Sequence, residues 1–254
     1  MSKRITIVAS WVALLSCLCL FLSFNGGCAK KEIETEYVSA IFLCWLDNSY
    51  QSAVLCSDPL ADPDDSEVQI EWNSSSVSFP YNYIYVGYIA FEADFYLEIA
   101  TDYTVSLTSD VGNCEGTVAI PEETYITNPS YGEILQLGQN VSCTWMEAQG
   151  ADFYFVGYYA DAYDNYGYYI TEVYSDTCIT NPAFTIPANF FDVSGATFYE
   201  VYLYVQPNGG VPPVPGSTGN MTGSISGFVN AEGYPVFTYF YVGTPPLKPS
   251  QGRQ

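Results

Sequence analysis

Histidine is absent from this 254-residue chain, and no lysine or arginine occurs between Lys31 and Lys248. Nucleophile–base pairs that use His or Lys are therefore impossible in that span. Phosphate sites built on a P-loop lysine or an arginine finger are excluded for the same reason. Paired carboxylates are the catalytic chemistry that remains, but among 28 acidic residues chance pairs are inevitable and support no activity. We therefore expect that the chain is not an enzyme.

The charge of the chain is strongly one-sided. The net charge is −22, and it becomes −24 without residues 1–27, which hold two of the six cations and none of the acids. Repulsion of this size excludes nucleic acid and anionic lipid headgroups as partners. A hydrophobic fraction of 48% and an aromatic fraction of 17% nevertheless provide enough apolar surface for a folded core.

The N-terminus has the features of an export signal. Lys3 and Arg4 precede an apolar run at residues 5–24, and Asn25-Gly26-Gly27-Cys28 follows. The small residues before Cys28 resemble the cleavage site of bacterial lipoprotein signals, although Asn25 stands where leucine is usual. The resemblance implies cleavage before Cys28, lipidation of Cys28 and attachment of the mature chain to a membrane through its N-terminal lipid.

Alternatives to this processing stay open. Leu14-Leu15-Ser16-Cys17 fits the lipoprotein pattern better in isolation, but cleavage there would leave residues 18–24 as an apolar N-terminus, so Cys28 is favoured. A plain signal peptide or an uncleaved anchor is also consistent, since about 20 apolar residues can just span a bilayer. By the same resemblance, Ala29 in place of a retaining aspartate implies the outer membrane of a bacterial cell envelope.

Cysteine usage after Cys28 suits an oxidising compartment. The five cysteines are Cys44, Cys56, Cys114, Cys143 and Cys178, so one thiol is left over. Cys143 and Cys178 lie in the same half of the chain and are expected to form a disulfide, and Cys114 is expected to pair with Cys44 or Cys56. Their spacings form no CxxC pattern, and without histidine we expect no structural zinc site.

Short apolar and aromatic runs, separated by Gly, Pro, Asn and Asp, recur after the signal and predict an all-β chain. Strands are predicted at residues 38–46, 52–56, 67–72, 83–91, 103–109, 116–120, 140–145, 152–159, 168–174, 183–186, 197–205, 223–230 and 236–242. About thirteen strands are too many for one ordinary β-sandwich and suit two in tandem.

The domain boundary is predicted after Ile120-Pro121, where residues 122–129 form an acidic, proline-bounded connection. The Gly- and Pro-rich residues 206–219 are predicted to be a long loop inside the second domain, because the strands after it still need a partner sheet. The expected order is a signal peptide (1–27), a tether (28–36), an N-terminal β-sandwich (37–121), a second β-sandwich (122–243) and a flexible tail (244–254).

Short motifs in the second half resemble the opening of fibronectin type III and immunoglobulin-like modules: Asn128-Pro129-Ser130-Tyr131-Gly132, Leu137-Gly138-Gln139, Val141-Ser142-Cys143-Thr144-Trp145 and Gly150-Ala151-Asp152-Phe153-Tyr154. The resemblance implies that Trp145 is a core residue and that the second domain is an immunoglobulin or fibronectin III-like sandwich.

The first half is similar to small sandwiches of the transthyretin-like or carboxypeptidase-regulatory type. The motifs that carry this similarity are Glu67-Val68-Gln69-Ile70, Tyr103-Thr104-Val105-Ser106-Leu107 and Val118-Ala119-Ile120-Pro121. With Gly219-Asn220-Met221-Thr222-Gly223 and Gly227-Phe228, the order resembles uncharacterised bacterial outer-membrane lipoproteins. The resemblance implies a partner such as a TonB-dependent receptor and brings no catalytic residues.

Two acidic segments are candidate calcium sites. The first gathers five acids within ten residues, enough oxygen ligands if the loop folds back on itself: Asp58, Asp62, Asp64, Asp65 and Glu67. It lacks the spacing and central glycine of an EF-hand, and a solvated acidic loop is the alternative. Asp161 and Asp164, beside Asn165 and Gly167, form a weaker second candidate.

Tyrosine is in excess, with 24 residues, and alternation places many of its side chains on predicted solvent faces. In residues 197–205, Glu200 marks the face that also carries Tyr202 and Tyr204. The same reasoning places Tyr154 and Tyr158 opposite Phe153 and Phe155, and Tyr239 and Tyr241 opposite Phe240 and Val242. A hairpin tip is predicted to carry Tyr163, Tyr166, Tyr168 and Tyr169.

Tyrosine provides amphipathic contact area at low entropic cost. The predicted ligand-binding residues are Tyr154, Tyr158, Tyr163, Tyr166, Tyr168, Tyr202 and Tyr204. The alternative is that tyrosine covers a sheet that has no lysine or arginine stems to cover it.

Two functions therefore stand. In the first, the protein is a lipid-anchored binding protein that recognises a glycan, a peptide or another envelope partner. In the second, it is a structural accessory of an envelope protein complex and has no soluble ligand.

Overall fold

The computed structural model describes residues 38–44, 51–56, 62–79, 81–85, 88–93, 98–99, 101–110, 112–212 and 219–245. Nearly all regular structure in these ranges is β-strand, which confirms the predicted all-β fold. The helices of this part are the short 3₁₀ helices η1 (Pro63–Asp65) and η2 (Ala188–Phe191), and none of its helices could cross a membrane. The predicted signal peptide, Cys28 and the tether lie outside the described residues.

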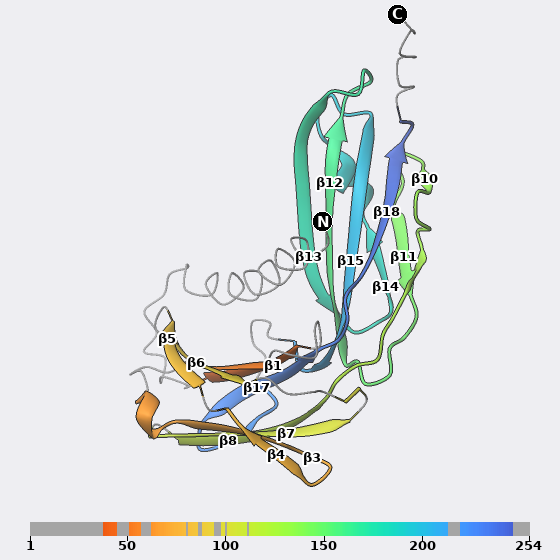
Figure 1. Ribbon diagram of the computed structural model, residues 1–254. Helices are drawn as coiled ribbons and strands as arrows, with labels where there is room; N and C mark the ends of the chain where they lie inside the picture. Colours follow the sequence, from red (N-terminus) through yellow and green to blue (C-terminus); the bar gives the residue numbers. More distant parts are fainter. Residues whose placement is uncertain are drawn as a thin grey trace, which may run out of the picture.

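Two sheets enclose a core in the lower half of Figure 1. The first sheet has the order β16-β8-β7-β3-β4, with β3 (Glu67–Trp72), β4 (Ser75–Ser78), β7 (Asp102–Ser109), β8 (Gly112–Ala119) and β16 (Thr222–Gly223). The facing strands have the order β17-β1-β2-β6-β5, with β1 (Val38–Cys44), β2 (Gln51–Cys56), β5 (Tyr81–Tyr85), β6 (Tyr88–Ala93) and β17 (Ser226–Glu232). Strand alternation buries Val68, Ile70, Val105 and Leu107 between them.

A second core lies in the upper half of Figure 1. A three-stranded sheet contains β9 (Ile126–Asn128), β11 (Val141–Trp145) and β14 (Ala183–Ile186). It packs against β13 (Tyr169–Ile179), β12 (Phe153–Tyr163), β15 (Phe198–Gly210), β18 (Val236–Gly243) and β10 (Ile134–Leu135). Trp145 is 4% exposed in this core, as predicted, and its ring packs edge-on against Tyr154.

Strand β15 belongs to both halves (Figure 1). Its first part pairs with β12 and β18 of the upper half, and residues Asn208–Gly210 pair with β17, which pairs in parallel with β1. One ten-stranded sheet therefore continues through the two cores. Where β15 passes the lower half, a Cβ on Gly209 would lie 2.1 Å from the carbonyl oxygen of Ala119, so this position has room for glycine alone.

The return of the chain to the lower half differs from the sequence prediction. Residues 223–230 were expected in the second domain, but β16 pairs with β8, β17 pairs with β1, and Met221, Ile225 and Val229 lie in the first core. Residues 206–210, predicted to begin a loop, continue β15 instead. The partner sheet that these strands needed exists, but it is the one formed by the first half of the chain.

Other predicted strands change in extent. The single strand predicted at 83–91 is instead part of the antiparallel hairpin of β5 and β6. The prediction missed the turn because Gly87 is the only turn-favouring residue in this run of Tyr, Ile, Val and Ala. Strands β12 and β13 each extend to 11 residues, so their hairpin projects further than predicted.

We expect the Gly209→Ala substitution to destabilise the protein, because the added methyl group must displace the backbone of Ala119. Overpacking of this kind costs roughly 1–3 kcal/mol, which a urea unfolding curve resolves. Gly157→Ala is the matched control, since its Cβ would meet its nearest side-chain atom at 3.6 Å, an ordinary contact distance. Equal unfolding midpoints for the two variants would contradict the close approach of β15 and β8.

Candidate binding face

The outer face of the C-terminal sheet is defined by alternation along β15 and β12. In β15, buried residues alternate with Glu200, Tyr202 and Tyr204, which are half-buried. This confirms the face predicted from Glu200. The register sets Tyr202 opposite Tyr159 and Glu200 opposite Asp161, so the side chains of β12 and β15 share one surface.

Tyrosine alone forms one row across this face. The strand register aligns one residue from each of β13, β12, β15 and β18, namely Tyr174, Tyr159, Tyr202 and Tyr239. Tyr131, from the loop between β9 and β10, adds a fifth ring whose centroid lies 6.0 Å from that of Tyr239. We call these five residues the tyrosine row. Its ends are the most exposed, with Tyr131 at 82% and Tyr174 at 78%.

The inner rings of the row pack on one another. Tyr159 and Tyr202 stack with centroids 4.6 Å apart and planes 11° from parallel, close to the spacing of about 4.8 Å between neighbouring strands. The rings therefore stand upright on the sheet, and each covers a face of its neighbour. Tyr239 continues the row with a centroid 4.8 Å from that of Tyr202. The ring faces that Tyr159 and Tyr202 turn toward each other are therefore closed to solvent.

The hydroxyl groups of the three inner tyrosines of the row remain protonated at neutral pH. Burial raises the pKa of Tyr159, Tyr202 and Tyr239 above the ordinary value of 10.0. For Tyr239 a hydrogen bond with Tyr241 adds to this effect, and the charge of Glu200 contributes as well. Burial and the charge of Glu200 raise the pKa of Tyr163 to about 12. Tyr159, Tyr202 and Tyr239 are therefore neutral hydrogen-bonding groups.

Three carboxylates form the next row along the same strands. Asp161 of β12 lies opposite Glu172 of β13 on one side and opposite Glu200 of β15 on the other. We call these three residues the acidic row. The Tyr163 hydroxyl donates a hydrogen bond to Glu200 Oε2 at 3.3 Å. Like charges directly opposite one another destabilise a sheet, and the chain has no cation between Lys31 and Lys248 to offset them.

Two of the predicted ligand-binding tyrosines are core residues, so their placement was wrong. Tyr154 is 1% exposed, and its hydroxyl accepts a hydrogen bond from the Ala148 N–H at 2.9 Å. Tyr158 is 7% exposed and packs against Phe184 and Phe190. The face of β12 is inverted relative to the prediction because Tyr and Phe alternate without polar residues at its start.

Tyr159 is the β12 residue that sequence reasoning missed. It lies two residues before Asp161, so it shares a face with a carboxylate in the same way that Tyr202 shares one with Glu200. Asp161 was the available signal, because a charged residue marks the solvent face of a strand whose opposite positions are small and apolar, such as Ala160 and Ala162.

The remaining predicted tyrosines lie at different places. Tyr202 belongs to the tyrosine row, whereas Tyr204 packs between Phe155 and Phe237, with its hydroxyl donating to Gln206 Oε1 at 2.5 Å. Tyr163 lies on the outer face beside Glu200. Tyr166 and Tyr168, at 75% and 72% exposure, occupy the β12–β13 hairpin tip.

The acidic candidates for calcium that the structure describes do not converge on one point. Among the described residues, no three carboxylate or thiol side chains converge as ligands for a metal ion. The exposed loop uses Asp62 as a turn residue, since its Oδ1 accepts the Asp64 N–H at 3.0 Å, and Asp58 lies outside the described part. Asp164 accepts the N–H groups of Tyr166 and Tyr168 at 2.9 Å each and so holds the hairpin tip in shape, whereas Asp161 lies in β12. Calcium binding at Asp58, Asp62, Asp64, Asp65 and Glu67 stays a prediction.

The predicted disulfide between Cys143 and Cys178 is wrong, because both residues are free thiols. Cys143 is fully buried in the second core, whereas Cys178 lies opposite Phe155 on the outer face of the sheet. Proximity in sequence could not reveal that β13 presents Cys178 to the face away from the core. Cys114 is buried with its Sγ 3.9 Å from Met221 Sδ, and the side chains of Cys44 and Cys56 lie outside the described residues.

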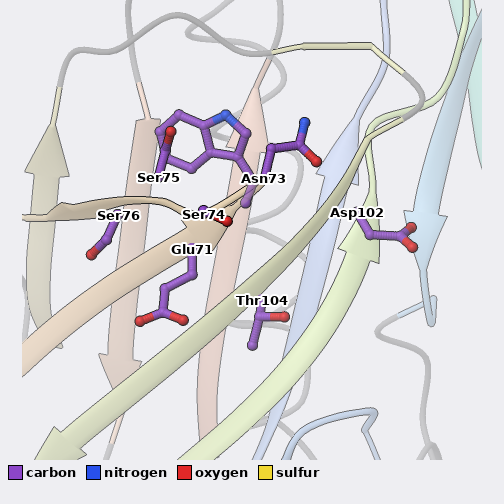
Figure 2. Close-up of a pocket in the computed structure, with 8 residues that line it drawn as sticks. Glu71, Asn73, Ser74, Ser75, Ser76, Asp102 and Thr104 are labelled. Carbon is purple, nitrogen blue, oxygen red and sulfur yellow. The ribbon is translucent and has the colours of Figure 1, made fainter.

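A hollow of about 360 Å³ lies on the lower half, over the turn between β3 and β4. Its lining includes two carboxylates, Glu71 and Asp102, together with Trp72, Asn73 and three serines. Figure 2 shows the carboxylates of Glu71 and Asp102 pointing away from each other. The hollow therefore lacks the facing carboxylate pair that glycoside hydrolysis needs.

Comparison with known proteins gives a fold likeness alone. No protein-family model and no curated protein matches the chain. The fibronectin(III)-like modules of Clostridium thermocellum CbhA align over 85% of this chain and 95% of theirs, at 10% identity and a TM-score of 0.29. The Yersinia pseudotuberculosis adhesin InvE aligns over 78% of this chain and 58% of its own, at 11% identity and a TM-score of 0.23. CBD12 from CALX1.2 aligns over 84% and 100%, at 9% identity and a TM-score of 0.23. The chain thus has a weak structural resemblance to fibronectin III-like modules and other β-sandwich domains.

The free thiols predict a chemical outcome. After denaturation without reductant, iodoacetamide should alkylate both Cys143 and Cys178, because neither sulfur is in a disulfide. In the folded protein the reaction should be slow at pH 8, since burial raises the pKa of Cys143 to about 12 and that of Cys178 to about 11. A peptide pair joined through these two cysteines in a non-reducing mass spectrum would contradict the structure.

The raised tyrosine pKa values predict alkaline sensitivity. With a pKa of about 12 when folded and 10.0 when unfolded, Tyr163 holds its proton more tightly in the folded state. Its contribution is fully present below pH 10 and is lost as the pH rises toward 12. Tyr163→Phe should therefore make the fall in unfolding free energy between pH 10 and 12 shallower, as measured by urea titrations. Tyr166→Phe, at the exposed hairpin tip, serves as the control, and equal slopes for the two variants would count against this environment of Tyr163.

Proposed function

We propose that the protein is a non-catalytic, lipid-anchored binding protein of the bacterial cell envelope, and that the tyrosine row and the acidic row together form its ligand face. One observation carries this proposal: five tyrosines lie side by side across four strands and the adjoining loop, next to three carboxylates in a span of sequence, residues 32–247, that contains no lysine, arginine or histidine.

The composition of the face supports recognition more than catalysis. The span from residue 32 to residue 247 contains no histidine, lysine or arginine, so it lacks the His and Lys general bases and the cationic anion-binding groups. Tyrosine hydroxyls can donate and accept hydrogen bonds around a ligand, and carboxylates can accept them, without chemical change. A structural accessory function would use the same face toward a membrane protein.

The geometry supports a polypeptide partner in preference to a glycan. A sugar ring stacks on an open aromatic face, but the rings of Tyr159 and Tyr202 already cover one another. Upright rings and their hydroxyls suit the mixed polar and apolar surface of a protein segment, as in tyrosine-rich antibody loops. The uncompensated carboxylates favour a partner that carries lysine or arginine, through ion pairs and cation–π contacts.

We expect photo-crosslinking in native envelopes to identify this partner. A benzophenone amino acid in place of Tyr239 should capture one defined polypeptide, and Tyr202→Ala should reduce that capture at least tenfold, because Tyr202 packs directly on Tyr159 and Tyr239. Tyr125→Ala, a 57% exposed tyrosine preceding β9 in the opposite sheet, is the matched control.

A second probe position makes the test specific to the face. The same crosslinker at Glu115, an exposed residue of β8 in the lower half, should capture nothing in common with position 239. Identical products from both positions, or capture of polysaccharide at position 239, would overturn the proposed polypeptide-binding face.

A further inference from the structure

Strand β13 is a long edge of the C-terminal sheet. It spans 11 residues and, within the part of the chain that the structure describes, pairs with β12 alone. Figure 1 shows it at the border of the upper half, alongside β12, with which it pairs in antiparallel register. The other border strands of this half are short, with three residues in β9, two in β10 and four in β14. One side of β13 therefore offers a row of backbone N–H and C=O groups.

Natural edge strands usually carry features that prevent pairing with another chain, such as proline, charged side chains and lysine above all, a bulge or very short length. The charges on β13 are those of Glu172 and Asp176, which repel an acidic strand and attract a basic one. The sequence Tyr-Ile-Thr-Glu-Val-Tyr-Ser-Asp-Thr-Cys-Ile of β13 contains no proline, glycine or lysine and is rich in strand-favouring residues. Its register with β12 is regular except near the hairpin tip, between Ala162 and Tyr163. Tyr174, Tyr169 and Ile170 are exposed on it at 78%, 57% and 39%.

The charge of β13 identifies the kind of strand that fits. Glu172 and Asp176 flank Tyr174 on the outer face, and Asp161 lies behind Glu172 on β12. A neighbouring strand would place alternate side chains opposite these three residues. Lysine or arginine at those positions would pair with both carboxylates and contact the Tyr174 ring. The residues between them would lie beside Thr171, Val173 and Ser175, which are half-buried and suit valine or threonine.

A second copy of this chain does not fit the edge. The antiparallel register that pairs all eleven residues of two β13 strands is centred on Tyr174. It sets Glu172 of each copy opposite Asp176 of the other, and like charges in that position destabilise the pairing. The whole chain also has a net charge of −22, so two copies repel.

We propose that β13 binds an extended, basic polypeptide segment by strand addition, with main-chain hydrogen bonds along the edge and lysine or arginine side chains over Glu172, Tyr174 and Asp176. This inference rests on the proposed function, because it names the partner and the way in which that partner reaches the tyrosine row. The row begins at Tyr174 on β13 itself, so an added strand would lie directly beside it.

The test uses the purified lipidated chain and a defined probe, the capped peptide Thr-Lys-Val-Lys-Thr-Lys-Val-Lys-Thr with a fluorescent label. We expect saturable binding by anisotropy that weakens as salt rises. Glu172→Lys should weaken it at least tenfold, while Glu115→Lys, which makes the same change of charge on the exposed face of β8, should leave it within twofold. Glu172→Lys should still fold, since it replaces a like-charge pair with Asp161 by an opposite-charge pair.

Two further peptides separate strand addition from simple charge attraction. The peptide with N-methyl groups on two consecutive central residues keeps its charge but blocks one N–H on each edge, so it should bind at least tenfold more weakly. The peptide with glutamate in place of lysine should not bind. In hydrogen exchange, the lysine peptide should protect amides of residues 169–179 and leave those of β3 unchanged.

The outcomes distinguish this inference from the proposed function. Equal binding of the lysine and N-methylated peptides, or no binding of the lysine peptide, would overturn strand addition at β13. If crosslinking at position 239 still depended on Tyr202 in that case, the ligand face would stand without the edge. If the peptide bound as expected but the crosslink failed, the inferred site would stand and the proposed envelope function would fall.

Discussion

The continuity of β15 is the constraint on which the rest of the structure depends. Its first part builds the sheet that carries the tyrosine row, and its end pairs with β17 and so holds the strand that completes the lower core. Polar side chains are buried where it crosses between halves, and they are satisfied locally: Asn208 Nδ2 donates to the Gln206 carbonyl at 2.8 Å, and Asn230 Oδ1 accepts the Val211 N–H at 3.0 Å. The position and tilt of the outer face are thereby fixed by a strand that both cores hold.

The lack of cations determines what covers this face. Long lysine and arginine side chains usually lie along exposed apolar surface with their charges in water. In this chain tyrosine takes that place, with rings that pack on one another and hydroxyls at the surface. This explains why a row of tyrosine is stable without a ligand. The lack of cations does not explain the adjacent acidic row, whose carboxylates repel one another.

The sequence predicted the features that depend on the residue pattern within one strand, such as which face is exposed. The carboxylate of Glu200 among alternating apolar residues identified the face of β15 correctly, the alternation of Tyr with Phe and Val identified that of β18, and the composition identified the all-β fold. The start of β12 alternates Tyr with Phe, two residues with nearly equal preference for burial. The pattern therefore does not distinguish the two faces, and the predicted face of β12 was wrong. The return of residues 221–232 to the first core depends on pairing between β17 and β1, nearly 190 residues apart, which no local pattern specifies.

The acidic row is best understood by comparison with an acid that has a clear structural use. Asp164 accepts two backbone N–H groups and holds the hairpin tip in shape. Asp161, Glu172 and Glu200 instead lie opposite one another in register, an arrangement that costs stability and that neutral residues would relieve. Arrangements that oppose stability on an exposed surface are expected where a partner supplies the missing charge. Since Glu172 lies on the edge strand itself, the partner that relieves the repulsion can do so by adding one strand to the sheet.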